Sequence, residues 1–308
     1  MGKIAFVFPG QGAQYVGMGK DFYEAYPEFR SRLAQASDRL GFSVEKLMFE
    51  EEEKLNLTEY TQCAMVSVCG AITDLVREAG IRPDVCAGLS LGEYAALYAC
   101  GIFSYEDAVA AVRERGILMQ NTVPAGIGSM AAIIGLTAEQ VENICGKTPG
   151  RVSVANDNCP GQLVITGERQ AVLEAAQKAK EAGARRALEL KVSGPFHSEL
   201  LIPAAEPLRK ILEGLALSEP EMPYVANTTA AYVKEKEEVI DLLARQIYSP
   251  VRFRESVLKM NDEGVDTFIE IGPGHTLSSM IRKTIKGART YSVDRVEDLQ
   301  KLKEEMGC

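Results

Sequence analysis

The sequence lacks transmembrane segments, a secretory signal and the ligand spacing of a metal-binding site. None of its apolar runs reaches the length of a transmembrane helix. The N-terminus, "MGKIAFVFPGQG", has a short apolar run followed by turn residues, which predicts a buried strand and not a secretory signal. The seven cysteines include no Cys-x-x-Cys pair, and this odd, scattered set predicts reduced thiols in a cytoplasmic protein. The two histidines lie at no metal-ligand spacing from cysteines or acidic residues, so we expect no bound metal.

Positive charge is also scarce. Lys and Arg number 34 against 43 Asp and Glu, which gives a formal net charge of -9. Nucleic-acid binding requires a basic footprint, so we expect no nucleic-acid partner, and the lack of long apolar runs predicts no membrane partner. With 308 residues, 46% of them apolar, the chain can bury a large core and form one large unit and a smaller one.

Alternating strand and helix patterns predict an α/β fold with a mainly parallel sheet. "KIAFVFPG" and "PDVCAGLS" are the first expected strands, and the segment 58–80 between them has helical length and an apolar face. Further strands are expected in "PYVAN" and "TFIEIGPG", with a helix in "EVIDLLARQIY". We expect these segments to form a larger α/β-hydrolase-like subdomain over residues 1–125 and 195–308.

The pattern changes over residues 126–194. Four expected strands, "SMAAIIGL", "RVSVANDN", "QLVITG" and "ARRALELKV", alternate with two expected helices, "TAEQVENIC" and "RQAVLEAAQKAKEAG". The order strand-helix-strand-strand-helix-strand is typical of ferredoxin-like folds. The segment is therefore predicted to be a small inserted subdomain.

A serine between two glycines occupies the turn after the second expected strand, in "GLSLG" at 88–92. A serine hydroxyl must be exposed, deprotonated and given donors for the oxyanion before it can act as a nucleophile. The glycines would let strand and helix approach closely around Ser90, and the N–H of Leu91 would supply one donor. These residues fit a helix cap equally well, because Ser90 and Glu93 match the capping-box pattern Ser-x-x-Glu.

Two histidines are candidates for the base, and the residues alone do not choose between them. His197, in "VSGPFHSEL", and His275, in "IGPGHTLSS", each lie on a loop with proline and glycine before an expected helix. "FPGQGAQ" at 8–14 follows the first strand, where doubly wound sheets place ligand-binding loops, although its glycines also fit an ordinary tight turn.

Several segments together resemble the malonyl-CoA:acyl carrier protein transacylase family, over nearly the whole chain. In order, they are "FVFPGQGAQYVGMG", "LTEYTQ", "GLSLGEYAAL", "ERGILMQ", "NDNCPGQLVITG", "GPFHS", "QIYSPVRF" and "EIGPGHTL". Such a series is far more specific than a glycine-flanked serine. The resemblance implies that malonyl-CoA and acyl carrier protein are the partners, and that the malonyl group passes to the phosphopantetheine thiol through a malonyl-serine intermediate.

The resemblance also implies the catalytic roles. Ser90 corresponds to the acylated serine, and the histidine of "GPFHS", His197, corresponds to the base. A carbonyl near Gln246 would orient that histidine, which needs an acceptor and not necessarily a carboxylate. The backbone N–H groups of Gln11 and Leu91 would bind the oxyanion.

Substrate contacts are implied at four residues. Arg115 alone would be taken for a solvated helix arginine, but the resemblance makes it the cation that binds the malonyl carboxylate, a task that suits a planar guanidinium. Met119 lies in the same matching segment, and Phe196 would crowd an α-methyl group. Asn156 is expected beside the pocket, although Asn-Asp-Asn before a proline also fits a turn. The sequence departs from the family at Leu89, where histidine is frequent.

Docking of an acidic carrier protein to this acidic chain would need a local positive surface. The candidates are Arg185 with Arg186 and Arg282 with Lys283, which fit solvated surface charge equally well. Exchange of one thioester for another implies no cofactor, and a monomer is expected. The alternatives are a serine thioesterase or esterase, a discrete trans-acting acyltransferase of polyketide synthesis, and a silent carrier-binding scaffold.

Overall fold

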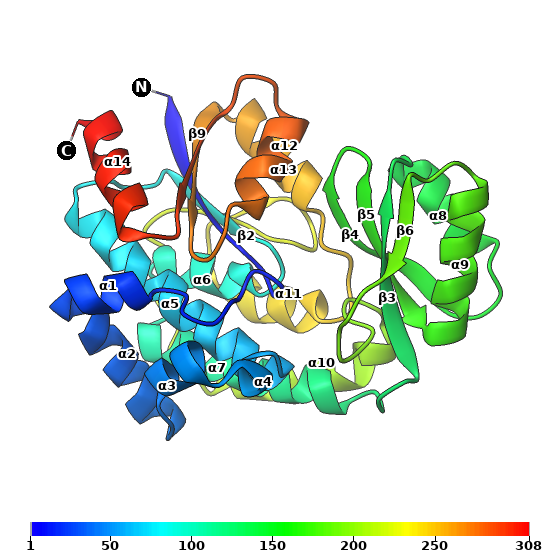
Figure 1. Ribbon diagram of the computed structural model, residues 1–308, viewed down its shortest axis with the longest axis horizontal. Coiled ribbons are helices and arrows are strands. Elements are labelled where there is room, and N and C mark those ends of the chain that lie inside the picture. The colour runs from blue at the N-terminus through cyan, green and yellow to red at the C-terminus, as the bar shows by residue number, and fades with distance from the viewer. Residues whose placement is uncertain (1, 308) are drawn as a thin grey trace.

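The computed structural model describes residues 2–307 and has two lobes, each built around its own sheet (Figure 1). The larger sheet has the strand order β10-β9-β1-β2-β7-β8, and all neighbours are parallel except β7 and β8. The expected α/β fold with a mainly parallel sheet is therefore confirmed. The strands are β1 (Lys3–Phe8), β2 (Val85–Gly88), β7 (Tyr224–Val225), β8 (Tyr232–Val233), β9 (Val265–Ile271) and β10 (Arg289–Val293).

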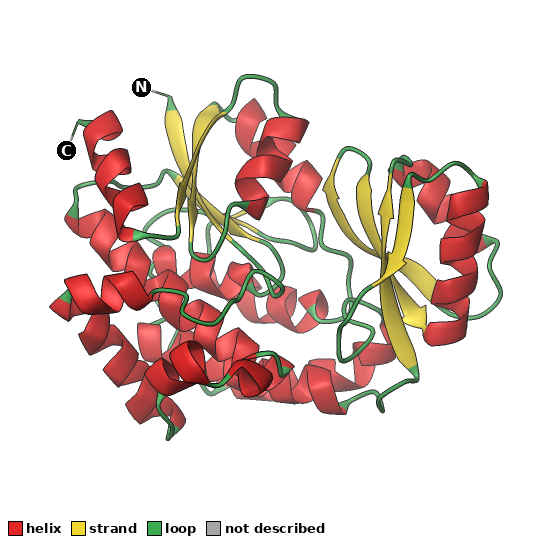
Figure 2. Cartoon of the chain, viewed as in Figure 1, coloured by secondary structure: helices red, strands yellow, loops and turns green. Residues whose placement is uncertain are grey.

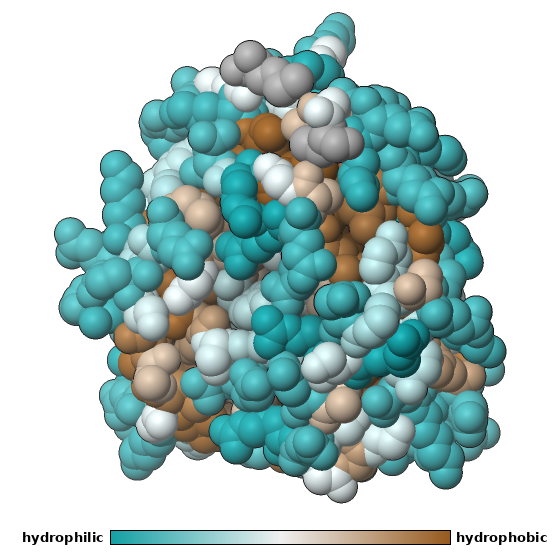
Figure 3. All heavy atoms as spheres, turned by 90° about the vertical axis from the view of Figure 1, so that its left-hand side faces the viewer, coloured by the Kyte–Doolittle hydropathy of each residue, from teal (hydrophilic) through white to brown (hydrophobic). Residues whose placement is uncertain are grey.

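Helices cover both faces of this sheet (Figure 2). They are α1 (Lys20–Ala25), α2 (Pro27–Leu40), α3 (Val44–Glu50), α4 (Glu52–Leu55), α5 (Thr58–Glu78), α6 (Gly92–Ala99), α7 (Tyr105–Asn121), α10 (Ile202–Glu213), α11 (Val239–Gln246), α12 (Phe253–Asp262), α13 (Thr276–Thr284) and α14 (Val296–Met306), with 3₁₀ turns at Glu199–Leu201 and Lys236–Glu238. Within residues 2–307, none has both the length and the apolar character needed to cross a membrane. Figure 3 shows the side of the molecule on which α1 and α14 lie. Polar residues cover most of this surface, and apolar residues are visible mainly between them.

Strand β1 shows how the larger lobe forms two apolar layers. Successive side chains of a strand point to opposite faces. Phe6 and Phe8 therefore join the core that contains α5 and α6, whereas Ala5 and Val7 pack with α12 and α13. A strand that is buried on both faces reads as a continuous apolar run, which explains why "IAFVF" does not alternate with polar residues.

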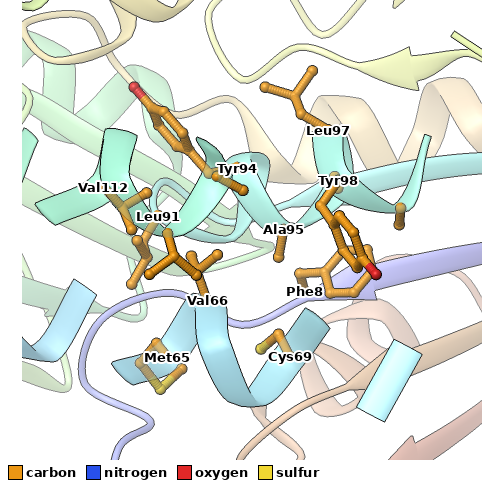
Figure 4. Packing of buried hydrophobic residues seen from close by; sticks show 14 of the residues in the cluster. Phe8, Met65, Val66, Cys69, Leu91, Tyr94, Ala95, Leu97, Tyr98 and Val112 are labelled. Carbon is orange, nitrogen blue, oxygen red and sulfur yellow. The ribbon is translucent and has the colours of Figure 1, made fainter. Parts of the chain in front are cut away.

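Helix α5 supports the start of α6. It is buried along nearly its whole length, and Figure 4 shows Val66 on the side that faces Leu91. Burying an aliphatic side chain of this size stabilises the fold by roughly 1.5–3 kcal/mol. The turn between β2 and α6 therefore lies on a rigid, densely packed base.

The smaller lobe is an antiparallel sheet with the strand order β4-β5-β3-β6. Its elements are β3 (Gly128–Ile134), α8 (Ala138–Gly146), β4 (Val152–Cys159), β5 (Gln162–Glu168), α9 (Arg169–Glu181) and β6 (Arg186–Glu189). The two helices pack on the face turned away from the larger lobe and share an apolar core with the strands (Figure 1). The strand and helix order predicted from the sequence is therefore confirmed.

Contacts between β4 and the segment before α12 join the two lobes. The N–H of Val251 donates to Ala155 O at 2.8 Å, and the N–H of Asp157 donates to Val251 O at 3.0 Å. Arg254 forms an ion pair with the Asp157 carboxylate at 2.7 Å. These bonds set the position of β4 relative to the larger sheet.

Candidate active site

Ser90 lies at the sharp turn between β2 and α6, and its φ is 53°. This left-handed conformation costs a non-glycine residue about 1–2 kcal/mol. The flanking glycines permit it: a Cβ at position 88 would lie 1.9 Å from the carbonyl carbon of Gly92, and one at position 92 would lie 2.1 Å from the carbonyl oxygen of Phe8. Only glycine at both positions lets strand and helix meet here.

The Ser90 hydroxyl is paired with a histidine. Ser90 Oγ lies 2.6 Å from His197 Nε2, and His197 Nδ1 lies 2.9 Å from the backbone oxygen of Gln246. Since a carbonyl oxygen only accepts, Nδ1 carries the proton and Nε2 accepts from the serine. His275, in contrast, is exposed just before α13. The structure thus places His197, and not His275, beside the serine.

Burial sets the protonation state of His197. Its side chain is almost completely buried, and desolvation, together with the positive charge of Arg115, lowers its pKa to about 4. The imidazole is therefore neutral at physiological pH. The backbone φ of His197 is 59°, so Ser90 and His197 both have left-handed backbones. Among the described residues, Ala230 is the only other non-glycine residue with a positive φ. Strained backbones of this kind gather at functional sites.

Arg115 of α7 reaches the same point. Its Nη2 donates to Ser90 Oγ at 3.1 Å and to Gln246 Oε1 at 2.9 Å, and its Nη1 donates to Gln62 Oε1 at 2.7 Å. The side chain is 0% exposed, which lowers the pKa of the guanidinium through desolvation, and the guanidinium carbon lies 5.5 Å from the centre of the Tyr94 ring. Its Nε has no acceptor within residues 2–307. A buried cation therefore lies within hydrogen-bonding distance of the candidate nucleophile.

Glu93 and Ser90 do not form a capping box. The N-terminus of α6 has no side-chain cap. The Glu93 carboxylate instead accepts from Gln246 Nε2 at 2.7 Å and from the backbone N–H of Asn227 at 3.3 Å. Since Ser90 Oγ is bonded to His197 and Arg115, the helix-cap interpretation is wrong.

The pair opens into a cavity of about 160 Å³ between the two lobes. Its walls contain the four residues expected to contact the substrate, which are Arg115, Met119, Phe196 and Asn156, together with Gly10, Gln11, Gln62, Leu89, Leu91, Met130, Asn158, Val164, Leu190 and Val192. The backbone N–H groups of Gln11 and Leu91 have no acceptor within residues 2–307. Both remain available to an oxygen atom bound beside the serine.

Two parts of the cavity wall, the Asn156–Asn158 segment and Leu89, differ from what local sequence patterns indicate. Asn156 and Asn158 belong to β4 and not to a turn, and the chain reverses after them, at Pro160 and Gly161. Leu89 packs its side chain partly against the core that contains α12 and α13. Position 89, where the sequence departs from the family that it resembles, is therefore an apolar part of the cavity wall.

The four basic residues expected at a docking surface are all exposed. Arg186 is the first residue of β6 and Arg185 directly precedes it, whereas Arg282 and Lys283 lie in the last turn of α13. Arg282 donates to the hydroxyl of Thr290. In the part of the chain that is described, none of the four forms an ion pair with an acidic side chain.

The sequence analysis did not assign three residues to the site: Gln62 and Asn227 were not singled out, and Glu93 was considered only as part of a helix cap. Gln62 anchors Arg115, while Glu93 and Asn227 surround the serine turn. Glu93 is the one charged residue of the largely apolar segment "GLSLGEYAAL", and this was the available signal. Gln62 stands in the mostly polar segment "LTEYTQ", where nothing singles it out. Asn227 follows the short strand β7 and carries no such signal.

Comparison with known proteins gives the class to which this fold and site belong. The chain belongs to the family of the acyl transferase domain, whose model matches residues 5–304.

Its relatives narrow the class further. The "Malonyl CoA-acyl carrier protein transacylase" of Bacillus subtilis (strain 168) is 45% identical over 313 residues, with 99% of each chain covered. The MCAT crystal structure from Streptococcus pneumoniae superposes with a TM-score of 0.94 at 46% identity and covers 98% of this chain and 100% of that one. A complex described as a type II PKS acyl-carrier protein with its malonyl-transacylase has a TM-score of 0.96 at 39% identity, covering 98% and 99%. The resemblance to the malonyl-CoA:acyl carrier protein transacylases is confirmed.

Proposed function

We propose that the protein transfers a malonyl group from malonyl-CoA to the phosphopantetheine thiol of an acyl carrier protein, through an ester on Ser90. One observation carries the proposal: in a single cavity, Ser90 Oγ lies 2.6 Å from His197 Nε2 and 3.1 Å from the buried guanidinium of Arg115. A serine and a base are enough for acyl transfer. The buried cation adds a partner for an acyl group that ends in a carboxylate.

In the first half-reaction, Ser90 Oγ attacks the thioester carbon while its proton passes to His197 Nε2. The Gln246 carbonyl holds the Nδ1 proton and thereby stabilises the imidazolium that forms. The free N–H groups of Gln11 and Leu91 bind the oxyanion. When the tetrahedral intermediate collapses, the carbon–sulfur bond breaks and His197 returns the proton to the departing sulfur of coenzyme A.

The second half-reaction repeats these steps with a different thiol. His197 takes the proton of the phosphopantetheine thiol, the sulfur attacks the malonyl ester, and Ser90 Oγ leaves with the proton from His197. One thioester replaces another, so the exchange is close to balanced in energy. We propose on this ground that the enzyme needs no cofactor.

Arg115 accounts for selection of the malonyl group. A guanidinium can pair with a carboxylate through two parallel N–H bonds. An acetyl group would leave this buried cation without an anion, and hydrogen bonds to charged groups contribute about 1.5–3 kcal/mol each. Met119 and Phe196, both in the cavity wall, supply apolar contacts to the methylene carbon.

We assign residues 1–125 and 195–308 to an α/β-hydrolase-like subdomain and residues 126–194 to a ferredoxin-like one. The serine turn between β2 and α6 and the strand order β4-β5-β3-β6 support these assignments. We propose that the protein functions as a monomer. Six buried free thiols support a cytoplasmic setting.

Intact-protein mass measurement after incubation with malonyl-CoA tests the proposal. We expect a malonyl adduct that is stable in the absence of acceptor, is removed by carrier protein, and is absent from Ser90→Ala. Rapid release of free malonate would instead indicate a thioesterase. No adduct would indicate a silent scaffold.

The two histidines provide an internal control for the same assay. His197→Ala should abolish acylation, because no other group takes the proton of Ser90 Oγ. His275→Ala should leave the rate within about twofold of wild type, since that side chain is exposed outside the cavity. The opposite result would show that His275, and not His197, is the base.

A further inference from the structure

Glu93 is a buried acid that the reaction above does not use, although it stands three residues after the nucleophile. Its side chain is 1% exposed, and a buried carboxyl group is costly unless hydrogen bonds compensate for its lost hydration. Both of its hydrogen-bond partners, Gln246 and Asn227, are buried as well. We propose that Glu93 is a positioning residue that acts through these two partners to hold Ser90 and His197 in reactive geometry. The inference rests on the proposed role of Ser90 as nucleophile.

Asn227 clamps the backbone of the serine turn. Its Oδ1 accepts from the N–H of Ser90 at 2.7 Å, and its Nδ2 donates to the carbonyl oxygen of Gly88 at 2.7 Å. The two bonds span the turn from the end of β2 to the strained residue, so they oppose relaxation of its left-handed conformation. Glu93 accepts from the backbone N–H of Asn227 at 3.3 Å and thereby fixes the clamp itself.

Gln246 connects the turn to the base. Its Nε2 donates both to the carbonyl oxygen of Ser90 at 2.9 Å and to Glu93 Oε2 at 2.7 Å. With both amide protons engaged, Oε1 is turned toward Arg115, which donates to it at 2.9 Å. The backbone oxygen of the same residue accepts from His197. One residue thus contacts nucleophile, base and cation, and Glu93 fixes its side chain.

Hydrogen bonding and charge are separable at Glu93. Burial raises the pKa of its carboxyl group to about 7, against the lowering effects of the bonds from Gln246 and Asn227 and of the Arg115 charge. A glutamine can accept through its Oε1 the same two bonds without a charge, whereas a leucine of similar size can accept neither. A positioning role therefore predicts that Glu93→Gln works well and Glu93→Leu does not.

Two reactions of Ser90 test the role. The first is single-turnover acylation by malonyl-CoA over a range of concentrations, which separates the maximal rate from the half-saturating concentration. The second is reaction with an uncharged sulfonyl fluoride, in which Ser90 Oγ displaces fluoride and His197 accepts the proton. This reaction does not depend on a carboxylate partner for Arg115. Glu270→Leu is the matched control, because Glu270 is equally buried but accepts only from Leu277 and Ser278 at the start of α13.

For Glu93→Leu we expect both maximal rates to fall about 100-fold, the loss typical of a small misplacement of reacting groups. The half-saturating concentration should stay within about twofold, Glu93→Gln should remain within about tenfold of wild type, and Glu270→Leu should keep the wild-type rate per folded molecule. The proposal is overturned if Glu93→Leu reacts at the wild-type rate, if only its half-saturation for malonyl-CoA changes, or if Glu93→Gln is as slow as Glu93→Leu.

Two further arms keep the test decisive. If Glu93→Leu does not fold, Asn227→Ala takes its place, with sulfonylation at least about tenfold slower expected and an unchanged rate overturning the proposal. If wild-type protein is sulfonylated at Ser90 but never acylated by malonyl-CoA, the proposed function fails. The sulfonylation rates of the variants then still decide the positioning role.

Discussion

Arg115 shows how little the neighbours of a residue in the sequence reveal about its surroundings. Within "ERGILMQ" it resembles a solvated helix arginine, yet the side chain is fully buried and bonded to residues from three other segments. Only the resemblance to a known family indicated its place. Glu93 was ambiguous for the same reason, because a local pattern predicts a helix cap while the fold supplies distant partners for the carboxylate.

Replacing this arginine should change which acyl group is transferred. For Arg115→Ala we expect kcat/KM with malonyl-CoA to fall at least about 100-fold, because a charge-assisted carboxylate contact is lost. With acetyl-CoA the fall should be much smaller, so the malonyl-to-acetyl ratio drops. Steady-state kinetics with both thioesters measures the ratio, and Arg113→Ala on the same helix is the control. A ratio equal to that of wild type would contradict the selectivity argument.

The secondary structure was predictable to the extent that burial leaves a pattern in the sequence. Strand β1, helix α5 and the elements of the smaller lobe were all expected, because they have long apolar runs or clear periodicity. Strands β8 and β10 were not expected. The first has two residues, and the second is mostly only partly buried. Their pairing partners, and not their own residues, make them strands.

The turn between β2 and α6 should tolerate no side chain at its second glycine. A Cβ at position 92 would meet the backbone of β1, which cannot move aside as a flexible side chain can. For Gly92→Ala we expect the free energy of unfolding to fall by about 3 kcal/mol and acylation to be lost. Denaturant titration and intact-mass measurement test both effects. Gly146→Ala, in α8 with open space around it, should be neutral or stabilising, and equal stability of the two variants would refute the argument.

At the scale of the whole molecule, the site depends on how the two lobes meet. The serine, the base and the cation belong to the larger lobe, but Asn156 and Met130 bring the smaller lobe into the cavity wall. Sequence patterns predicted both lobes, and the family resemblance placed Asn156 of the smaller lobe beside the pocket. They did not predict how the contact between the lobes is made. It depends on bonds such as those of Val251 with β4, which have no local signature in the sequence.

Carrier-protein docking is a property of the outer surface. Reversing the charge of Arg185 and Arg186, and of Arg282 and Lys283, should raise the KM for acyl carrier protein roughly tenfold at low salt, and less at high salt where such contacts are screened. Acylation by malonyl-CoA should not change. Reversal of the exposed Lys301 and Lys303 on α14 is the matched control. Carrier kinetics that are the same in all variants would exclude these residues from the docking surface.

Two buried groups give the stability of the protein an unusual pH dependence. The pKa of Glu93 is raised from 4.5 to about 7, so its contribution to the free energy of unfolding decreases as pH rises through this interval. The pKa of His197 is lowered from 6.5 to about 4, so its contribution increases as pH rises over that interval. In the wild type these two effects oppose each other from about pH 4.5 to about 6.5.

Removing the carboxyl group of Glu93 should leave only the contribution of His197 to this pH dependence. Relative to wild type, Glu93→Gln should gain about 3 kcal/mol in free energy of unfolding as pH rises from about 4.5 to about 7, since each pH unit of pKa change is equivalent to about 1.4 kcal/mol. Denaturant titrations across that range measure the gain, with the exposed Glu139→Gln as control. A difference that does not vary with pH would show that Glu93 is not held protonated by burial.

The distance between Arg115 and Ser90 limits the chain length of the acyl group that can be transferred. The guanidinium nitrogen lies 3.1 Å from the hydroxyl oxygen. If Arg115 binds the malonyl carboxylate as proposed, this distance fixes how far the carboxylate can lie from the carbonyl carbon that Ser90 attacks. A diacid with one more methylene, once seated on the arginine, would carry its thioester carbon past the serine and away from the oxyanion donors. The cavity of about 160 Å³ leaves little room for such a chain to fold back. The enzyme would then select its substrate by the length of the acyl chain as well as by the charge at its end.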